Sequence, residues 1–148
     1  MCSNLEPGGT VEFMDILYPL LSDDATLKPD SPMNRWAGLL QQGFAANGHS
    51  MRTALQYQEW LTSTGFIDVQ VVKEKWPSNT WPRDPKYKQV GMWTCENAIA
   101  ALHALSLAIF TRPEAQGGLG WTKEELEVLL EGVKSDFKNK SIHAYWPM

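Results

Sequence analysis

The sequence predicts a single α+β domain that is mostly helical and has two or three short strands. In four segments the apolar residues recur every three or four positions, which is the period of a helix with one buried face. In three other segments β-branched and aromatic residues alternate with polar ones or cluster, which is typical of strands. The 148 residues are 43% hydrophobic and 20% charged, so they can bury one core, and a disordered or collagen-like chain is excluded.

The predicted strands lie far apart in the chain. Thr10–Asp15 follows the turn Pro7-Gly8-Gly9 and alternates apolar with polar residues, as in a strand with one buried face. Phe66–Trp76 is rich in valine and ends in charged residues, which indicates a strand that runs from the core into solvent. Ser141–Pro147 also has β character and is the third candidate.

Two helices are predicted in the first half of the chain. The first begins with Ser31 as its cap and Pro32 at its first position, and it ends before Gly48. Proline suits the first turn of a helix and glycine suits the position beyond its end, so both end signals agree with the apolar period. The second helix is expected at Ser50–Thr64, with Gly65 as its stop.

Two further helices are predicted in the second half. Thr94 can cap a helix that runs to Phe110, and this helix is apolar almost all round, so we expect it to be buried. After a glycine-rich break, Thr122 and Glu125 have the spacing of a capping box, and apolar residues continue at helical spacing to Phe137.

A proline-rich loop is predicted between the second strand and the third helix, at Pro77–Gln89. This segment has three prolines, which is too many for a regular element, and it also carries Trp81 and Tyr87. Because so many aromatic residues are unusual in a simple connection, the loop is a candidate for function.

Charge and composition narrow the possible partners. Thirteen Lys and Arg against 17 Asp and Glu give a net charge of −4, and no dense basic run is present, so nucleic acid is not an expected partner. The longest mostly apolar stretch, Ala98–Phe110, is shorter than the roughly 20 residues that cross a bilayer. The N-terminus has no basic region followed by an apolar core. We therefore expect no membrane partner and a cytoplasmic location.

The two cysteines, Cys2 and Cys95, are predicted to be free thiols. Neither lies in a C-x-x-C pair or near a histidine at the spacing of metal ligands, so no metal site is expected. Cys95 has the pattern of a buried structural cysteine. Whether either thiol is reactive is not determined by the sequence.

Several sequence blocks together resemble one protein family. Leu5-Glu6-Pro7-Gly8-Gly9 and the strand after it resemble the turn and fifth strand of class I S-adenosylmethionine-dependent methyltransferases. Phe66–Pro77, Trp81–Tyr87 and Lys140–Pro147 are similar to the LaeA-like methyltransferases of fungi, which are found among regulators and tailoring enzymes of secondary metabolism. The resemblance covers nearly the whole chain and implies the back half of a Rossmann-like methyltransferase fold.

The chain departs from this family in its front half. The family's G-x-G-x-G turn and the acidic residue that binds the ribose are missing, and Pro7-Gly8-Gly9 opens a strand and does not join a strand to a helix. The resemblance therefore implies that residues 1–148 are a single truncated methyltransferase-like domain without a cofactor. Half of such a sheet exposes an unpaired edge, so we expect a homodimer that completes the fold.

Candidate site residues come from the histidines and tryptophans. His143 lies in the segment most like the family and is the first candidate for an acid or base, and Tyr145, on the same side, is the predicted catalytic residue that supports it. His103 lies in the most apolar helix, as a satisfied core group or a second catalytic group. The tryptophans expected to line a pocket for a hydrophobic ligand, with ordinary core packing as the alternative, are Trp36, Trp76, Trp81 and Trp93.

These observations leave several functions open. The first hypothesis is a cofactor-independent cyclase, isomerase or pericyclase that acts on a hydrophobic small molecule, because such reactions need shape and a few hydrogen bonds. The alternatives are a non-catalytic methyltransferase remnant or a binding or regulatory module, and a split methyltransferase that needs a separate cofactor-binding half. Methyl transfer by this chain alone is the least favoured, since the cofactor turn is missing.

Overall fold

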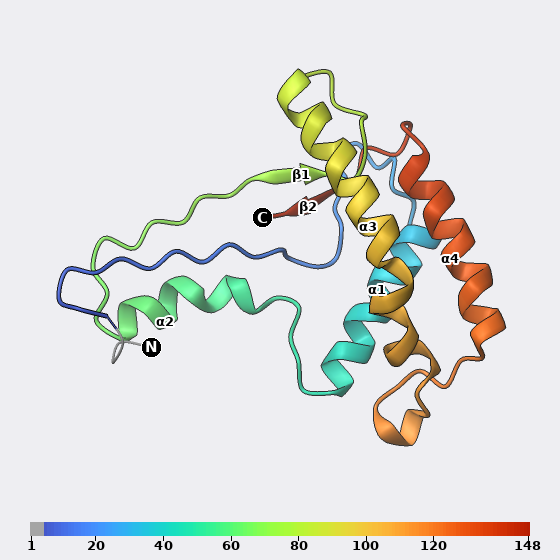
Figure 1. The fold of residues 1–148 in the computed structure, drawn as a ribbon, viewed down its shortest axis with the longest axis horizontal. Helices are drawn as coiled ribbons and strands as arrows, with labels where there is room; N and C mark the ends of the chain where they lie inside the picture. Colours follow the sequence, from blue (N-terminus) through green and yellow to red (C-terminus); the bar gives the residue numbers. More distant parts are fainter. Residues whose placement is uncertain (1–4) are drawn as a thin grey trace.

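Three helices pack against one another and form the body of the protein, and an arm extends from it (Figure 1). The computed structural model describes residues 5–148. Cys2, predicted to be a free thiol, lies outside the described residues. The helices are, in chain order, α1 (Pro32–Ala46), η2 (Thr53–Gln56), α2 (Tyr57–Ser63), α3 (Pro85–Thr111), η3 (Glu114–Gln116) and α4 (Lys123–Lys138).

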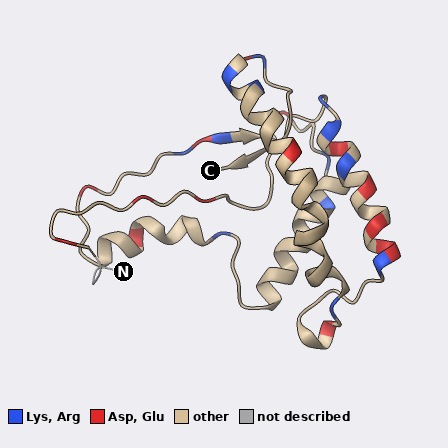
Figure 2. Cartoon of the chain, in the orientation of Figure 1, with Lys and Arg blue, Asp and Glu red and all other residues tan. Residues whose placement is uncertain are grey.

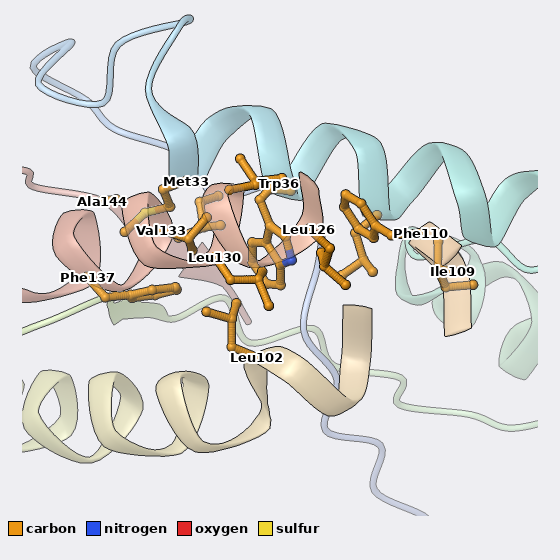
Figure 3. Packing of buried hydrophobic residues seen from close by; sticks show 14 of the residues in the cluster. Met33, Trp36, Leu102, Ile109, Phe110, Leu126, Leu130, Val133, Phe137 and Ala144 are labelled. Atoms are coloured by element: carbon orange, nitrogen blue, oxygen red, sulfur yellow. The ribbon is translucent and has the colours of Figure 1, made fainter. Parts of the chain in front are cut away.

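The hydrophobic core lies between α1, α3 and α4, with Trp36 of α1 at its centre (Figure 3). The ring of Trp36 meets Phe137 of α4 edge-on, with 6.4 Å between centroids. Its Nε1 donates a hydrogen bond of 2.8 Å to Ser106 Oγ of α3, so the buried indole leaves no donor unpaired. The largest fully buried apolar side chains are Trp36, Phe110, Phe137, Met33, Leu40, Leu102, Leu126, Leu130 and Val133.

The ends of α1 and α4 confirm the capping signals in the sequence. Ser31 Oγ accepts a bond from the Asn34 backbone N–H at the start of α1, and Gly48 beyond its end has a φ of +77°. At the start of α4, Thr122 and Glu125 form both bonds of the capping box. Each cap satisfies N–H groups that have no partner within the helix.

Helix α3 begins earlier than predicted. Asp84 is its cap and accepts bonds from the backbone N–H groups of Lys86 and Tyr87, and Pro85 occupies the first turn. Thr94, the predicted cap, lies inside the helix. The prediction treated the three prolines of Pro77–Gln89 as helix breakers, whereas proline in the first turn lacks only an N–H that would be unpaired anyway. The second part of the predicted proline-rich loop is therefore helix.

Helix α3 is also less buried than expected. Leu102, Ser106, Ile109 and Phe110 face the core, but Trp93 is 63% exposed. Within the described part of the chain, α3 is the one helix whose length and composition would suit a membrane span. The core helix of a soluble protein meets the same criterion, and the buried face of α3 packs on α1 and α4.

The sheet is small and has β2 (Tyr145–Pro147) at its centre. On one edge β2 pairs antiparallel with β1 (Lys75–Pro77), with Trp76 opposite Trp146. On the other edge Leu21 forms an antiparallel bridge with Tyr145. The predicted third strand is thus confirmed over its last residues.

The two other predicted strands are wrong over most of their length. Thr10–Asp15 has no strand pairing, and in Phe66–Trp76 the strand begins only at Lys75. Both segments have strand-like composition, but a strand forms only where another segment meets its N–H and C=O groups. Pairing with β2 stops at Glu74 and Met148, so the preceding residues have no partner strand.

The predicted helix at Ser50–Thr64 is broken into two short pieces, η2 and α2. Gly65, the predicted stop, has a φ of +95° and ends α2 as expected. We call residues 5–17 and 52–74 the arm. Its two extended segments run alongside α2, away from the body (Figure 1).

Gly91 of α3 should be one of the most sensitive positions in the body. A side-chain carbon at Gly91 would collide with the backbone carbonyl of Asn79, which cannot move away cheaply. We expect Gly91→Ala to destabilise the protein by roughly 1–3 kcal/mol, which lowers the melting temperature by about 3–10 °C for a chain of this length. Gly38 is a matched control, since nothing lies within 4 Å of the corresponding carbon. Gly38→Ala should raise the melting temperature slightly, because alanine favours a helix interior.

Candidate functional site

Three of the predicted site residues meet where the last segment enters β2. We call this cluster, Asp23, Asp24, Trp81, His143 and Tyr145, the His143 corner. His143 Nδ1 lies 2.5 Å from Asp24 Oδ2, and its ring stacks on Trp81 with 4.9 Å between centroids. The side chain of His143 is 38% exposed, so the corner lies at the surface.

Asp24 is held as a carboxylate by several donors. The hydroxyl of Thr26 donates to Oδ1 at 2.7 Å, its backbone N–H at 3.2 Å, and Ser22 Oγ at 2.9 Å. These donors, above all the Thr26 hydroxyl and then His143, hold the pKa of Asp24 well below its usual range. Thr26 also accepts a bond from the His143 backbone N–H, at 2.8 Å. The loop and the last segment are therefore tied together twice.

Tyr145 is held by a second pair of charges in the corner. Its hydroxyl donates to Asp23 Oδ1 at 2.7 Å, and the Lys75 ammonium lies 4.7 Å from the centre of its ring. Lys75 also pairs with Asp23 at 2.5 Å, and this contact lowers the pKa of that carboxyl. Burial, followed by the bond to Asp23, raises the pKa of Tyr145. Tyr145 is therefore a neutral donor at physiological pH.

The side chain of Asn79 connects the Trp81 loop to the last segment of the chain. The sequence analysis did not single out this residue. It is 3% exposed, its Oδ1 accepts a bond from the Trp81 N–H, and its Nδ2 donates to the carbonyl of Asn139. Trp81 Nε1 in turn donates to the Ala144 carbonyl at 2.9 Å. The only available signal was an Asn between Ser78 and Thr80, which is common in turns.

The remaining predicted site residues lie elsewhere. His103 is exposed on α3, with its Nε2 3.0 Å from Glu127 of α4. Trp93 is exposed on α3, Trp36 is a core residue, and Trp76 is half-buried on β1. A pocket walled by Trp81 and Trp93 therefore stays a prediction. An open groove of about 570 Å³ in the described residues lies elsewhere and is lined by Pro32, Arg35, Trp121, Glu124, Glu125, Val128 and Leu129.

The contacts of the His143 corner hold two surface loops against the last segment of the chain. A carboxylate that orients a histidine is the arrangement of many general bases. Such a base acts on a substrate held beside it, and two hollows of the described residues, one at Pro32 and Leu129 and one at Gln41 and Met51, are lined by residues outside the corner. What the corner does in this structure is fasten the 22–26 and 79–81 loops to β2.

The arm is the second candidate site, because it exposes large apolar side chains. Ile67 is 85% exposed, and Val72 is 76% exposed. Tyr57 of α2 holds the arm in shape, since its ring packs on Phe13 at 5.2 Å and its hydroxyl donates to Asp15 Oδ2 at 2.6 Å. The exposed apolar residues of the arm are Phe13, Met14, Ile16, Leu55, Trp60, Ile67, Val71 and Val72. Exposed apolar patches rimmed by polar groups commonly mark binding surfaces.

Curated proteins match this chain from end to end. The probable methyltransferase tdiE of Emericella nidulans is 31% identical over 99% of this chain and 44% of its own length. The secondary metabolism regulator LAE1 of Cochliobolus heterostrophus is 34% identical over 97% of this chain and 46% of its own length. The protein-methionine methyltransferase laeA of Emericella nidulans is 29% identical over 97% of this chain and 37% of its own length.

This chain is homologous to the LaeA-like methyltransferases of fungi. The resemblance in the sequence is thereby confirmed, and this chain spans less than half the length of these relatives. No family model matches it. No solved structure matches it either.

The described residues of this chain do not fit S-adenosylmethionine. Such a cofactor lies against a glycine-rich turn between a strand and a helix. The one glycine-rich turn that leads into a helix, Gly117–Gly120, joins η3 to α4. A carbon added at Gly118 would collide with the Arg112 backbone, and one at Gly117 would meet the Asn47 side chain, so protein atoms already fill this turn. No step of a reaction is therefore assigned to the cofactor.

The hydrogen bonds of Asp24 should make the stability of the folded chain depend on pH in the acidic range. Because the pKa of Asp24 is lower in the folded than in the unfolded chain, its bonds stabilise the protein above about pH 4 and lose this effect as the pH falls below that value. We expect Asp24→Asn to lower the melting temperature at pH 7 and to flatten its fall between pH 5 and pH 3. Asp30→Asn, in the same loop, is the control and should follow the unchanged chain. An unaltered acid profile in Asp24→Asn would contradict this role.

The two histidines should differ in their contribution to stability. His143→Gln removes the ring that stacks on Trp81, so we expect a loss of about 1 kcal/mol, or roughly 2–4 °C in melting temperature. His103→Gln removes only an exposed pair with Glu127, which contributes about 0–1 kcal/mol. Thermal unfolding of both variants tests the difference. Equal losses of melting temperature in the two variants would mean that the two histidines contribute equally to stability, which would contradict this prediction.

Proposed function

We propose that this chain is a non-catalytic, methyltransferase-like binding module of fungal secondary metabolism, and that its arm binds a second polypeptide. The exposed apolar side chains of the arm carry the proposal. They lie on a surface whose segments are held together, since Tyr57 of α2 packs on Phe13 and donates a hydrogen bond to Asp15. Burying such a surface against a partner is favourable by about 25 cal/mol for each Å² of apolar area.

The comparisons support the part of the proposal that describes the chain as methyltransferase-like and related to fungal secondary metabolism. The relatives are named as methyltransferases or as regulators of secondary metabolism, and each is more than twice as long as the matched segment. A partner that resembles the front half of a LaeA-like methyltransferase is therefore the partner we propose. The central position of β2, between the Leu17–Leu21 segment and β1, supports the back half of a Rossmann-like fold.

A cyclase or isomerase is the second candidate function. It is favoured by one observation, the contact of His143 with Asp24 beside the ring of Trp81. It is less favoured than the binding module, because His103 and Trp93 lie outside the corner. Turnover of a hydrophobic precursor that is lost in His143→Gln, at unchanged melting temperature, would favour this alternative.

Cofactor binding tests the non-catalytic part of the proposal. We expect no heat in calorimetry when S-adenosylmethionine is added to the purified chain, because its residues form no cofactor turn. Saturable micromolar binding to the chain alone would contradict the proposal. Light scattering on the same sample checks the homodimer that the sequence predicts.

Partner binding tests the role of the arm. The probe is the front half of a LaeA-like methyltransferase, expressed with this chain as a separate polypeptide. We expect the two to copurify and Val72→Asp to weaken the complex by tenfold or more, since a buried unpaired carboxylate costs several kcal/mol. Val128→Asp on α4 is the matched control, because Val128 is 77% exposed and Val72 is 76% exposed. Equal binding by the two variants would show that the arm is not part of the interface.

A further inference from the structure

The body has one end at which basic side chains gather. Residues 83–88, at the start of α3, and residues 138–140, at the end of α4, together carry five bases and one acid, although the net charge of the whole chain is −4. Figure 2 shows both groups of bases at the same end of the body. We call these five exposed residues, Arg83, Lys86, Lys88, Lys138 and Lys140, the basic end.

Two contacts hold the two parts of the basic end beside each other. Cys95 Sγ of α3 donates to the carbonyl of Phe137 at 3.5 Å, and the residue after Phe137 is the first base of this part of α4. Asn79 Nδ2 donates to the Asn139 carbonyl at 3.1 Å. The carbonyl of Asn79 lies against Gly91 of α3. The end of α4 therefore lies beside the first three turns of α3.

The bases of the basic end are not neutralised within the body. In the part of the chain that the structure describes, the lysines that form ion pairs are Lys75 and Lys134, which lie outside the basic end. Asp84, the acid within the two segments, caps α3 and accepts bonds from two backbone N–H groups. An excess of one charge on a surface attracts ligands of the opposite charge. The basic end therefore favours an acidic partner.

Two large apolar side chains are exposed next to these bases. Trp93 is 63% exposed and Met92 is 41% exposed. Met92 follows Lys88 by four residues and Trp93 follows Lys86 by seven, so each apolar residue lies on the same face of α3 as one base. Exposed apolar side chains rimmed by charged groups commonly mark binding surfaces. A ligand for this surface should therefore carry apolar side chains as well as carboxylates.

We propose that the basic end, together with Met92 and Trp93, binds an acidic segment of another polypeptide that has apolar residues between its carboxylates. This goes beyond the proposed function, because the surface lies on the body and not on the arm. Nucleic acid fits less well. Its backbone carries a charge at every phosphate, and the net charge of −4 repels such a dense polyanion at longer range.

The arm of a second copy is the competing ligand. The arm has six acids and two bases, and it also exposes apolar side chains. An arm that bound the basic end of the next copy would form a head-to-tail contact, which extends into long assemblies unless it closes into a ring. A separate acidic polypeptide is therefore the partner that we propose, and self-association is measured in the test.

The proposal is tested with a fluorescently labelled synthetic peptide, in which glutamates are interspersed with phenylalanines. A control peptide has lysine in place of each glutamate. We expect only the acidic peptide to bind, and Lys88→Glu to weaken its binding by about fivefold or more, because attraction becomes repulsion. Lys123→Glu is the matched control, since Lys123 is an exposed lysine in the first turn of α4 and its exchange changes the net charge equally. Equal weakening by the two variants would overturn the proposal.

A second measurement tests the apolar contact. We expect Trp93→Ala to weaken binding of the peptide by about tenfold, and to have no effect on a peptide with serine in place of each phenylalanine. An equal effect on both peptides would overturn the role of Trp93. Tighter binding of a single-stranded oligonucleotide than of the acidic peptide would overturn the proposal in favour of nucleic acid. Assemblies that grow with concentration and are lost in Lys88→Glu, measured by light scattering, would overturn it in favour of a second copy.

Discussion

The structure depends on the two-sided pairing of β2. One edge binds Leu21 and the other binds β1, so the last residues of the chain join segments from its beginning and its middle. The same strand reaches into the core, where Trp146 stacks on Phe137 of α4 with 5.6 Å between centroids. Because Trp146 and Tyr145 are nearly fully buried, the strand cannot leave without opening the core. The arm and the body are thus held by one short element.

The His143 corner reinforces this joint with polar groups. Hydrogen bonds to Asp24 and Asn79 fasten two loops to the segment before β2, and all of these contacts link residues far apart in the sequence. A catalytic site would need room for a substrate beside such groups. Here the stacked ring of Trp81 covers one face of His143, and structural use of the histidine accounts for its contacts.

The body and the arm differ in how well they satisfy their own groups. In the body a core of apolar side chains is buried and the first turns of α1 and α4 are capped, although Trp93 and Val128 are exposed. The arm has the opposite character, with exposed Val72 and Ile67 beside backbone groups that lack pairing. The proposal that the arm binds a partner rests on these exposed groups. It also agrees with homology to proteins more than twice as long as the matched segment.

The sequence by itself determined the local features. The capping box at Thr122 and the helical period of α1 and α4 depend on residues within a few turns, so they could be predicted. The start of α3 at Asp84 was missed because proline can both end and begin a helix. Only the tertiary structure decided which strand-like segments pair, and that His143 meets Asp24, 119 residues away. Both depend on contacts between distant parts of the chain, which no local pattern encodes.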